Sequence, residues 1–206
     1  MKIGILGAGR VGGTLGRLWT SQGHQVMFGV RDPQGPKMQA LLADTGPAAQ
    51  VGSPTEAVAF GDVVLLAISW AGARAVIEQA GPWNDKILID ATNRLTPPSP
   101  DDAPSAAEDV ARWAKGARVV KAFNATGSVN MTAAPYGAQK VDIFLCGDDA
   151  QAKAVVADLI ASSGFDPVDC GPLANASLVE SLAKLWMQLA STMGNGPNIA
   201  FKLVHR

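Results

Sequence analysis

The sequence predicts an α/β protein with a doubly wound, mainly parallel sheet and a helical segment at its C-terminal end. Three observations predict it: short apolar runs alternate with helical patterns, most of these runs lack polar alternation, and glycines follow the first run. Runs that are apolar throughout are typical of strands covered on both faces, as in a parallel sheet. Strands that alternate with helices along the chain indicate an open sheet with helices on both sides.

Six apolar runs are expected to form the strands of this sheet. They are residues 2–7, 25–30, 62–69, 86–91, 118–123 and 142–147. Serines followed three residues later by glutamate indicate helix starts, because such a pair can satisfy the free N–H groups of a first turn. These capping-box patterns occupy residues 53–56, 105–108 and 177–180, and the first also has Pro54 at the first helical position.

The last part of the chain has a different pattern. Apolar residues recur at steps of three and four, which predicts a long amphipathic helix that ends near 193–198. The stripe consists of Leu178, Leu182, Leu185, Trp186, Leu189 and Met193. It must be buried against the rest of the chain or against a partner subunit, and the pattern fits both. We therefore divide the chain into a domain over 1–173 and a helical extension over 174–206.

Length and composition limit the classes of protein to consider. A chain of 206 residues, 48% hydrophobic and 17% charged, is long enough for a domain with a sizeable core. Its 17 basic and 18 acidic residues give a net charge of -1, which argues against nucleic acid or an anionic membrane as a partner. Cys146 and Cys170 are too few for a disulfide framework, and the longest apolar run, 63–68, is too short to span a bilayer. We expect reduced thiols in a soluble, cytoplasmic protein.

Residues 4–16, GILGAGRVGGTLG, contain the glycine pattern of a dinucleotide-binding turn. Gly7, Gly9 and Gly12 have the spacing G-x-G-x-x-G between an expected strand and an expected helix. In such turns the first glycine permits the tight bend, the second lets a pyrophosphate approach the backbone, and the third lets helix and strand pack closely. Free N–H groups at the start of the helix then bind the phosphates. This context predicts a dinucleotide site in a Rossmann-type domain.

Arg31 is the candidate residue for selecting the nucleotide. A site for NAD would have an acidic residue at the end of the second strand to bind the ribose hydroxyls. Here Gly29 and Val30 occupy that end, and Arg31 follows. A guanidinium can form paired hydrogen bonds with a 2′-phosphate, which a carboxylate would repel. The pattern favours NADP(H), with Lys37 as a second cation, provided that Asp32 caps the next turn or points away.

The sequence offers few groups for acid–base catalysis. His24 is expected at the end of the sheet opposite the ligand, and His205 is next to the last residue. Tyr136 and Lys140 have the Tyr-x-x-x-Lys spacing of short-chain dehydrogenases, but that pair requires a helix, and proline and glycine flank this tyrosine. The sequence has no Ser-His-Asp order and no cluster of metal ligands. We therefore expect an acceptor that carries its own electron sink, as flavins and deazaflavins do.

Six segments carry a resemblance that extends over nearly the whole chain. They are GILGAGRVGGTLG (4–16), GHQVMFGVRDP (23–33), DVVLLAISW (62–70), DATN (90–93), VVKAFNATG (119–127) and GPLANASLVESLAKLW (171–186). With them the chain resembles the NADPH-dependent coenzyme F420 (deazaflavin) reductases and is similar to the oxidoreductase domain of the STEAP metalloreductases. The resemblance implies an NADP-binding Rossmann domain, a C-terminal segment that helps to form the acceptor pocket, and a homodimer.

The resemblance also implies a set of site residues. Those expected to hold the pyrophosphate are Gly7, Ala8, Gly9, Arg10, Val11 and Gly12. Arg31 would bind the 2′-phosphate. Those expected around the nicotinamide and its ribose are Ser69, Trp70, Asn93, Asn124 and Thr126. Met131 and Leu173 would form walls of the acceptor pocket.

Three functions fit these observations. The first is an NADP(H)-dependent oxidoreductase that transfers a hydride between NADPH and coenzyme F420 or a related flavin-like acceptor. The second is a non-catalytic NADP-binding sensor or partner-binding module, because acid–base residues are scarce. The third is an imine reductase related to pyrroline-5-carboxylate reductase, whose larger helical dimer domain exceeds the chain that follows residue 174. We favour the first, although fold alone does not decide function.

Overall fold

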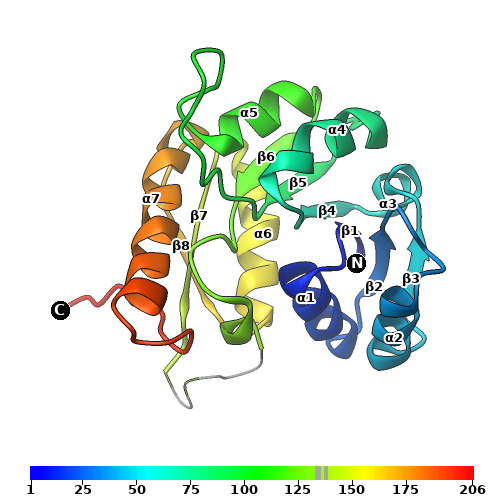
Figure 1. Ribbon diagram of the computed structural model, residues 1–206, viewed down its shortest axis with the longest axis horizontal. Helices are drawn as coiled ribbons and strands as arrows, with labels where there is room; N and C mark the ends of the chain where they lie inside the picture. The colour runs from blue at the N-terminus through cyan, green and yellow to red at the C-terminus, as the bar shows by residue number, and fades with distance from the viewer. Residues whose placement is uncertain (133–135, 137–138) are drawn as a thin grey trace.

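The computed structural model extends over residues 1–206 and describes all of them except 133–135 and 137–138. Within the described residues, eight strands form one sheet in the order β3-β2-β1-β4-β5-β6-β7-β8 (Figure 1). The strands are β1 (Lys2–Leu6), β2 (Gln25–Gly29), β3 (Ala49–Gly52), β4 (Val63–Leu66), β5 (Ile87–Asp90), β6 (Arg118–Lys121), β7 (Asp142–Gly147) and β8 (Asp166–Asp169). Neighbouring strands are parallel except β6 and β7, which are antiparallel. The predicted α/β class with a mainly parallel sheet is confirmed.

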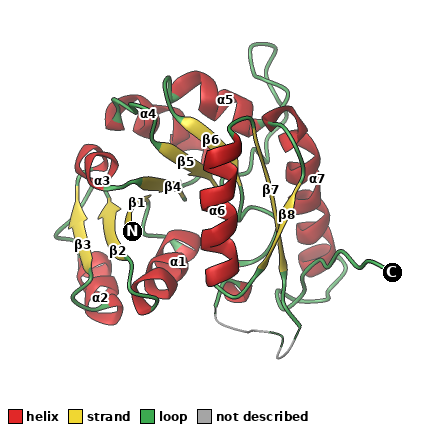
Figure 2. Ribbon diagram, turned by 180° about the vertical axis from the view of Figure 1, so that it is seen from behind, coloured by secondary structure: helices red, strands yellow, loops and turns green. Residues whose placement is uncertain are grey.

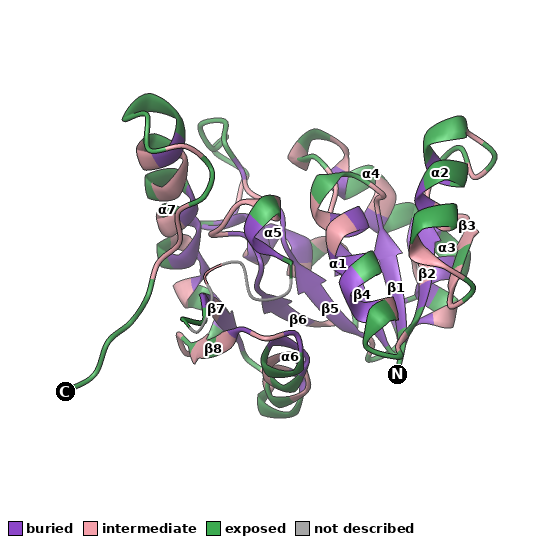
Figure 3. Ribbon diagram, turned by 90° about the horizontal axis from the view of Figure 1, so that it is seen from below, coloured by how far each residue is buried: buried purple, intermediate pink, exposed green. Residues whose placement is uncertain are grey.

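Helices cover both faces of this sheet. They are α1 (Arg10–Ser21), α2 (Pro36–Thr45), α3 (Pro54–Phe60), α4 (Trp70–Ala80), α5 (Ala106–Trp113), α6 (Ala150–Ser162) and α7 (Ala176–Met187). One cluster of buried apolar side chains joins the sheet to α1, α2 and α6, and a second joins it to α3, α4, α5 and α7 (Figure 2). Figure 3 shows the central strands buried between these layers. In the part of the chain that is described, no helix is both long and apolar enough to cross a membrane.

Two of the three predicted helix starts are confirmed. Ser53 precedes α3 and Ser105 precedes α5, and each forms a reciprocal capping box with the glutamate three residues later. The third prediction is wrong, because α7 begins one residue before Ser177 and has no side-chain cap. The glutamate of that pattern, Glu180, instead accepts hydrogen bonds from the first two N–H groups of α5, both at 3.1 Å. It therefore caps a neighbouring helix rather than its own.

The two edge strands, β3 and β8, are not predicted by the sequence. Both are only four residues long, and their residues are half-buried or exposed. A strand at an edge needs no continuous apolar run, so the signal that marks the central strands is missing. β8 also contains Pro167, which an edge strand tolerates because one of its sides has no partner strand to receive an N–H.

α7 packs on the sheet through a face other than the predicted stripe. Its buried residues are Ala176, Val179, Glu180 and Ala183. In the stripe, Leu178 is 66% exposed and Leu185 is 47% exposed. The helix continues in a π-helical turn, Gln188–Thr192, after which Met193 is 65% exposed. The described residues of the same chain therefore leave much of the stripe uncovered.

The tail that follows α7 returns to the first residue of β7. Lys202 Nζ lies 2.6 Å from Asp142 Oδ1, and the backbone N–H of Leu203 donates to Asp142 Oδ2 at 2.5 Å. Because β7 runs antiparallel to β6, its first residue lies at the edge where the parallel strands have their carboxyl ends. The tail thus reaches the edge at which doubly wound sheets bind their ligands.

Candidate nucleotide-binding site

The three glycines between β1 and α1 are needed for different reasons. Gly7 has a φ of +107°, which other residues rarely adopt. A Cβ on Gly12 would lie 2.1 Å from the carbonyl oxygen of Gly7, so only glycine lets α1 pack on the turn. A Cβ on Gly9 would have no atom within 4 Å among the described residues. The fold therefore does not require glycine at position 9, and the open space beside it is available to a ligand.

The start of α1 supplies donors to this turn. α1 begins at Arg10, has no side-chain cap and has no acidic residue in its first turn. The first N–H groups of a helix have no partner within the helix and lie at the positive end of its dipole, so they attract a phosphate. Arg10 is exposed, whereas Val11 is half-buried and packs against the core. Backbone groups, rather than these side chains, are thus the natural phosphate ligands.

A cavity of about 750 Å³ adjoins the turn. It lies over the carboxyl ends of β1, β2 and β4, where the order of the strands reverses. This is the position at which doubly wound sheets bind ligands, and the volume is that of a cofactor site. Its lining includes the predicted residues Gly7, Ala8, Gly9, Arg31 and Ser69, together with Lys37.

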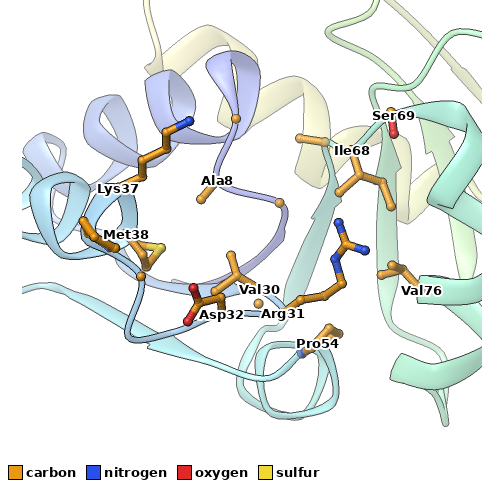
Figure 4. A pocket seen from close by; sticks show the side chains of 16 residues that line it. Ala8, Val30, Arg31, Asp32, Lys37, Met38, Pro54, Ile68, Ser69 and Val76 are labelled. Atoms are coloured by element: carbon orange, nitrogen blue, oxygen red, sulfur yellow. The ribbon is translucent and has the colours of Figure 1, made fainter.

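Arg31 and Lys37 line this cavity from different elements. Arg31 follows β2 and Lys37 belongs to the first turn of α2, and Figure 4 shows their side chains on opposite sides of Ala8. Asp32 also lines the cavity, but its carboxylate lies against its own turn, where a Cβ on Gly35 would be 2.6 Å from Oδ2. The carboxylate is thus turned toward the loop, and Arg31 and Lys37 are the two cations that the described lining offers to a 2′-phosphate.

Ser69 and Trp70 lie at the start of α4. Ser69 is the N-cap residue, but its side chain forms no capping hydrogen bond, so the hydroxyl is available to a ligand in the cavity. Trp70 packs on Trp113 of α5 with ring centroids 5.1 Å apart, and the guanidinium of Arg94 lies 5.9 Å from its ring. Arg94 is held in turn by Asp109 at 2.8 Å. Trp70 therefore has a fixed position beside the cavity.

Asn93 and Asn124 form a pair of amides across the ends of β5 and β6. Asn93 Nδ2 donates to the backbone oxygen of Asn124, and Asn124 Nδ2 donates to Asn93 Oδ1, both at 3.0 Å. Asn124 Nδ2 also lies 3.3 Å from the carbonyl oxygen of Val179 in α7. Asn124 Oδ1 is a buried acceptor with no hydrogen-bond partner among the described residues. Buried acceptors are normally satisfied, and a carboxamide N–H such as that of nicotinamide has the chemistry to satisfy this one.

A group of three buried charges, Asp90, Lys121 and Glu180, lies next to the amide pair; we call it the charge cluster. Lys121 Nζ is 2.9 Å from Asp90 Oδ2 and 3.3 Å from Glu180 Oε1, and it also donates to the backbone oxygen of Thr92. Asp90 and Lys121 are fully buried, and Glu180 is 6% exposed. Sequence reasoning misses this cluster. The available signal is a charged residue at the end of each of two apolar strands.

The remaining predicted residues, like Asn93 and Asn124, do not line this cavity. Thr126 Oγ1 accepts a hydrogen bond from Asn130 Nδ2 at 3.1 Å, and the same amide donates to two carbonyl groups of the C-terminal tail. Met131 is fully buried and Leu173 is 7% exposed, each within one of the two core clusters. Burial of this kind is at odds with direct contact to an acceptor, and their role as pocket walls stays a prediction.

The candidate acid–base residues His24 and His205 do not line the cavity, and Tyr136 and Lys140 form no hydrogen bond with each other in the described structure. His24 Nδ1 is 3.2 Å from the N-terminal amine, at the amino end of β2, and burial lowers the pKa of its imidazole. His205 lies in the exposed end of the tail. Tyr136 donates to Asn130 Oδ1 at 3.0 Å, whereas Lys140 lies 3.8 Å from a carboxylate of β8. Tyr136 and Lys140 thus bind different partners, although part of the segment between them is outside the described residues.

Comparison with known proteins places this chain in a family. A family model described as "NADP oxidoreductase coenzyme F420-dependent" matches residues 2–94. The metalloreductase STEAP3 of Rattus norvegicus is 32% identical over 181 residues, and the metalloreductase STEAP2 of Mus musculus is 24% identical over 183 residues. Each match covers 88% of this chain and 36% of the relative, so the chain spans about a third of the length of these curated relatives.

Solved structures extend the likeness to the whole chain. A protein of Arthrobacter sp. FB24, assigned as an F420-dependent NADP-reductase, has a TM-score of 0.88 and 30% identity, with all of both chains covered. A hypothetical protein of Sinorhizobium meliloti has a TM-score of 0.75 and 27% identity over all of this chain and 96% of that one. A reductive aminase of Aspergillus terreus in complex with NADPH shares the fold, with a TM-score of 0.68 and 21% identity over 94% of this chain and 62% of that one. The family model and the full-length match at 30% identity together show that the chain belongs to the family of F420-dependent NADP oxidoreductases.

Proposed function

We propose that this protein transfers a hydride between NADPH and coenzyme F420 or a related flavin-like acceptor. The observation that carries the proposal is the cavity at the β1–α1 turn, where Gly9 leaves open space beside free helix N–H groups and Arg31 lines the wall. The cavity thus offers backbone donors for a pyrophosphate and a guanidinium for a 2′-phosphate. Membership of an NADP oxidoreductase family supports the same assignment.

The residues of this chain bind and orient the nucleotide in the proposed reaction. The N–H groups of the first turn of α1 hold the pyrophosphate, Arg31 with Lys37 pairs with the 2′-phosphate, and the Ser69 hydroxyl contacts the ribose at the far end of the cavity. A bound NADPH supplies the hydride. Asn93 lies next along the sheet, where its amide contributes to the border of the nicotinamide.

The chemistry of the reacting end suits a conjugated acceptor. Ser69, Asn93 and Asn124 are uncharged groups that form hydrogen bonds but do not exchange protons near neutral pH. A simple ketone usually needs a protein acid beside its oxygen, whereas a deazaflavin or flavin ring accommodates the added charge itself. Such a reaction depends mainly on holding two ring systems in the right orientation.

A screen of NADPH oxidation tests the proposal. The purified chain is mixed with NADPH and one acceptor at a time, chosen from coenzyme F420, FMN, FAD, a ferric chelate, a quinone and a small imine, and absorbance at the nicotinamide band is followed. We expect turnover with F420 or a flavin. Turnover with the imine alone would overturn the assigned acceptor. Tight NADPH binding without oxidation by any acceptor would favour a sensor or partner-binding module instead.

We also propose that the protein is a homodimer formed through α7. The apolar stripe of α7, with Leu178 and Leu185 largely exposed, is what an isologous interface between two identical helices would bury. Exposed apolar patches on soluble chains commonly mark such contacts. A second copy seated there would also border the segment that we assign to the acceptor pocket. Light scattering of the native chain, expected at twice the mass of 21.3 kDa, tests this assembly.

A further inference from the structure

The charge cluster joins four elements of the molecule at one point. Lys121 ends β6, Asp90 ends β5, and Glu180 belongs to the buried face of α7. Glu180 also accepts hydrogen bonds from the first two N–H groups of α5. Asp90 Oδ1 accepts from the backbone N–H of Thr92 at 2.9 Å and from its hydroxyl at 2.7 Å. Every charge in the cluster is therefore satisfied by a specific partner.

Stability is a poor explanation for such an arrangement. Removing three charges from water costs several kcal/mol per ion, and apolar side chains of similar volume often serve a core equally well. Buried ionic groups do hold the elements that they join in one defined geometry. The effect of the cluster is to be found in the groups whose positions it fixes.

Those groups are the two amides that follow β5 and β6, Asn93 and Asn124. Lys121 holds the backbone oxygen of Thr92, and Asn93 is the next residue. Glu180 follows Val179, whose carbonyl oxygen accepts from Asn124 Nδ2. The ion pair between Lys121 and Glu180 thus connects to both members of the amide pair. Lys121 is hydrogen-bonded to the residue before Asn93, and Glu180 follows the residue whose carbonyl oxygen accepts from Asn124.

We propose that Lys121 and Glu180 are positioning residues for the nicotinamide end of the nucleotide. They dock α7 against the ends of β5 and β6 and thereby set the geometry of the Asn93–Asn124 pair. The inference rests on the proposed function, because it takes the amide pair as a border of the nicotinamide. The pyrophosphate and 2′-phosphate contacts lie in the separate cavity at the β1–α1 turn, so the charge cluster is expected to leave them unchanged.

Two ligands separate these contributions without any turnover. Calorimetry gives the dissociation constants of NADPH and of 2′-phospho-ADP-ribose, which keeps the pyrophosphate and the 2′-phosphate but lacks the nicotinamide ring. The ratio of the two dissociation constants measures how much the nicotinamide ring contributes to the affinity. For the native chain we expect NADPH to bind about tenfold more tightly, the equivalent of one or two hydrogen bonds. In the variants we expect this ratio to fall to about one, with 2′-phospho-ADP-ribose bound within about twofold of the native affinity.

Two variants and one control make the test decisive. Glu180→Gln removes one charge and keeps the shape of the side chain. Asp90 and Lys121 then remain as an ion pair whose charges balance. The triple variant Asp90→Asn, Lys121→Met and Glu180→Gln discharges the whole cluster, so that no buried charge is left without a partner if the single change fails to fold. Lys153→Met with Asp169→Asn is the control, since it removes an ion pair of 2.8 Å between α6 and β8 that shares no residue with the charge cluster.

The outcomes distinguish this inference from the proposed function. If the native chain binds neither ligand, the proposed function fails. If it binds both but with a native ratio near one, or if the folded variants keep the native ratio, the positioning role is overturned while nucleotide binding stands. Equal weakening of both ligands in the variants would indicate a general structural role and would also overturn it. The control variant is expected to keep the native ratio.

Discussion

At the scale of single residues, the glycine turn separates positions that serve the fold from a position that serves a ligand. Gly12 leaves no room for a side chain because its Cβ would meet the carbonyl oxygen of Gly7 at 2.1 Å, whereas the space at Gly9 is open. Substitution of these two glycines is therefore expected to have different consequences: loss of ligand binding at Gly9 and loss of stability at Gly12. Comparing the two substitutions tests whether the open space is a binding site.

Gly9→Val is expected to abolish binding of NADPH and NADH while the thermal midpoint stays within about 2 °C of the native value, because the new side chain fills only ligand space. Gly12→Ala is expected to lower the free energy of unfolding by about 1–3 kcal/mol through overpacking. Calorimetric titration and thermal unfolding measure the two effects. A Gly9→Val chain that still binds NADPH would place the pyrophosphate elsewhere.

Arg31→Ala is expected to weaken NADPH by roughly tenfold to a hundredfold and to leave NADH nearly unchanged, since a charge-assisted pair with the 2′-phosphate contributes about 1.5–3 kcal/mol. Competition binding with both nucleotides measures the ratio. Arg17→Ala, which removes an exposed cation from α1, is the control for net charge. Equal losses for the two nucleotides would refute the assigned role.

At the scale of elements, α7 combines two faces with different partners. Ala176, Val179, Glu180 and Ala183 face the sheet, and Leu178 and Leu185 face outward. The apolar period in the sequence correctly predicts a helix here, but it does not predict which face of the helix packs on the sheet. Apolar spacing alone cannot tell a core from an interface, and here a charged residue, Glu180, lies on the inner face because Lys121 and the start of α5 satisfy it.

Leu178→Lys combined with Leu185→Lys is expected to convert the proposed dimer into a monomer, because four lysines would then meet across the two-fold axis. Light scattering at several concentrations measures the change in mass. Lys184→Glu, an exposed charge change on the same helix, is expected to leave the dimer intact. A native chain that is monomeric at all concentrations would contradict the interface.

The central strands and two capping boxes are predictable from sequence because each depends on neighbours within a few residues. Six apolar runs coincide with six observed strands, whereas β3 and β8 are short edge strands that lack the apolar signal. The turn glycines and Arg31 are likewise local. The Asn93–Asn124 pair and the charge cluster join residues about 30 to 90 positions apart, and no local pattern specifies which distant charges meet.

At the scale of the whole molecule, burial controls the chemistry of the thiols. Both cysteines are free, and burial raises the pKa of Cys146 to about 12 from an ordinary value of 9.0. The folded state therefore disfavours the thiolate. Below pH 9 the thiol is protonated in the folded and the unfolded chain alike, so Cys146 gives stability no pH dependence there. Above pH 9 the unfolded chain loses the proton first, and stability is expected to fall as the pH rises toward 12.

Chemical denaturation at pH 8 and pH 10 tests whether the free energy of unfolding falls as the pH rises. The native chain is expected to lose up to about 1 kcal/mol more between the two pH values than a Cys146→Ala chain, in which this group cannot titrate. Each chain is compared with itself at the lower pH, which removes the constant effect of the smaller side chain. An identical pH response in both chains would show that Cys146 titrates normally.

The reversal of direction between β6 and β7 has a consequence for how this architecture can diversify. It brings residues 197–203 beside the segment that follows β6, where Asp142 and Asn130 bind them, whereas every residue that lines the cavity at the β1–α1 turn lies between Gly7 and Val76. Changes in the final stretch of polypeptide therefore need not alter the β1–α1 turn or the cavity beside it. Under the proposed function, substitutions in the tail would change the preferred acceptor while the same nucleotide stays bound.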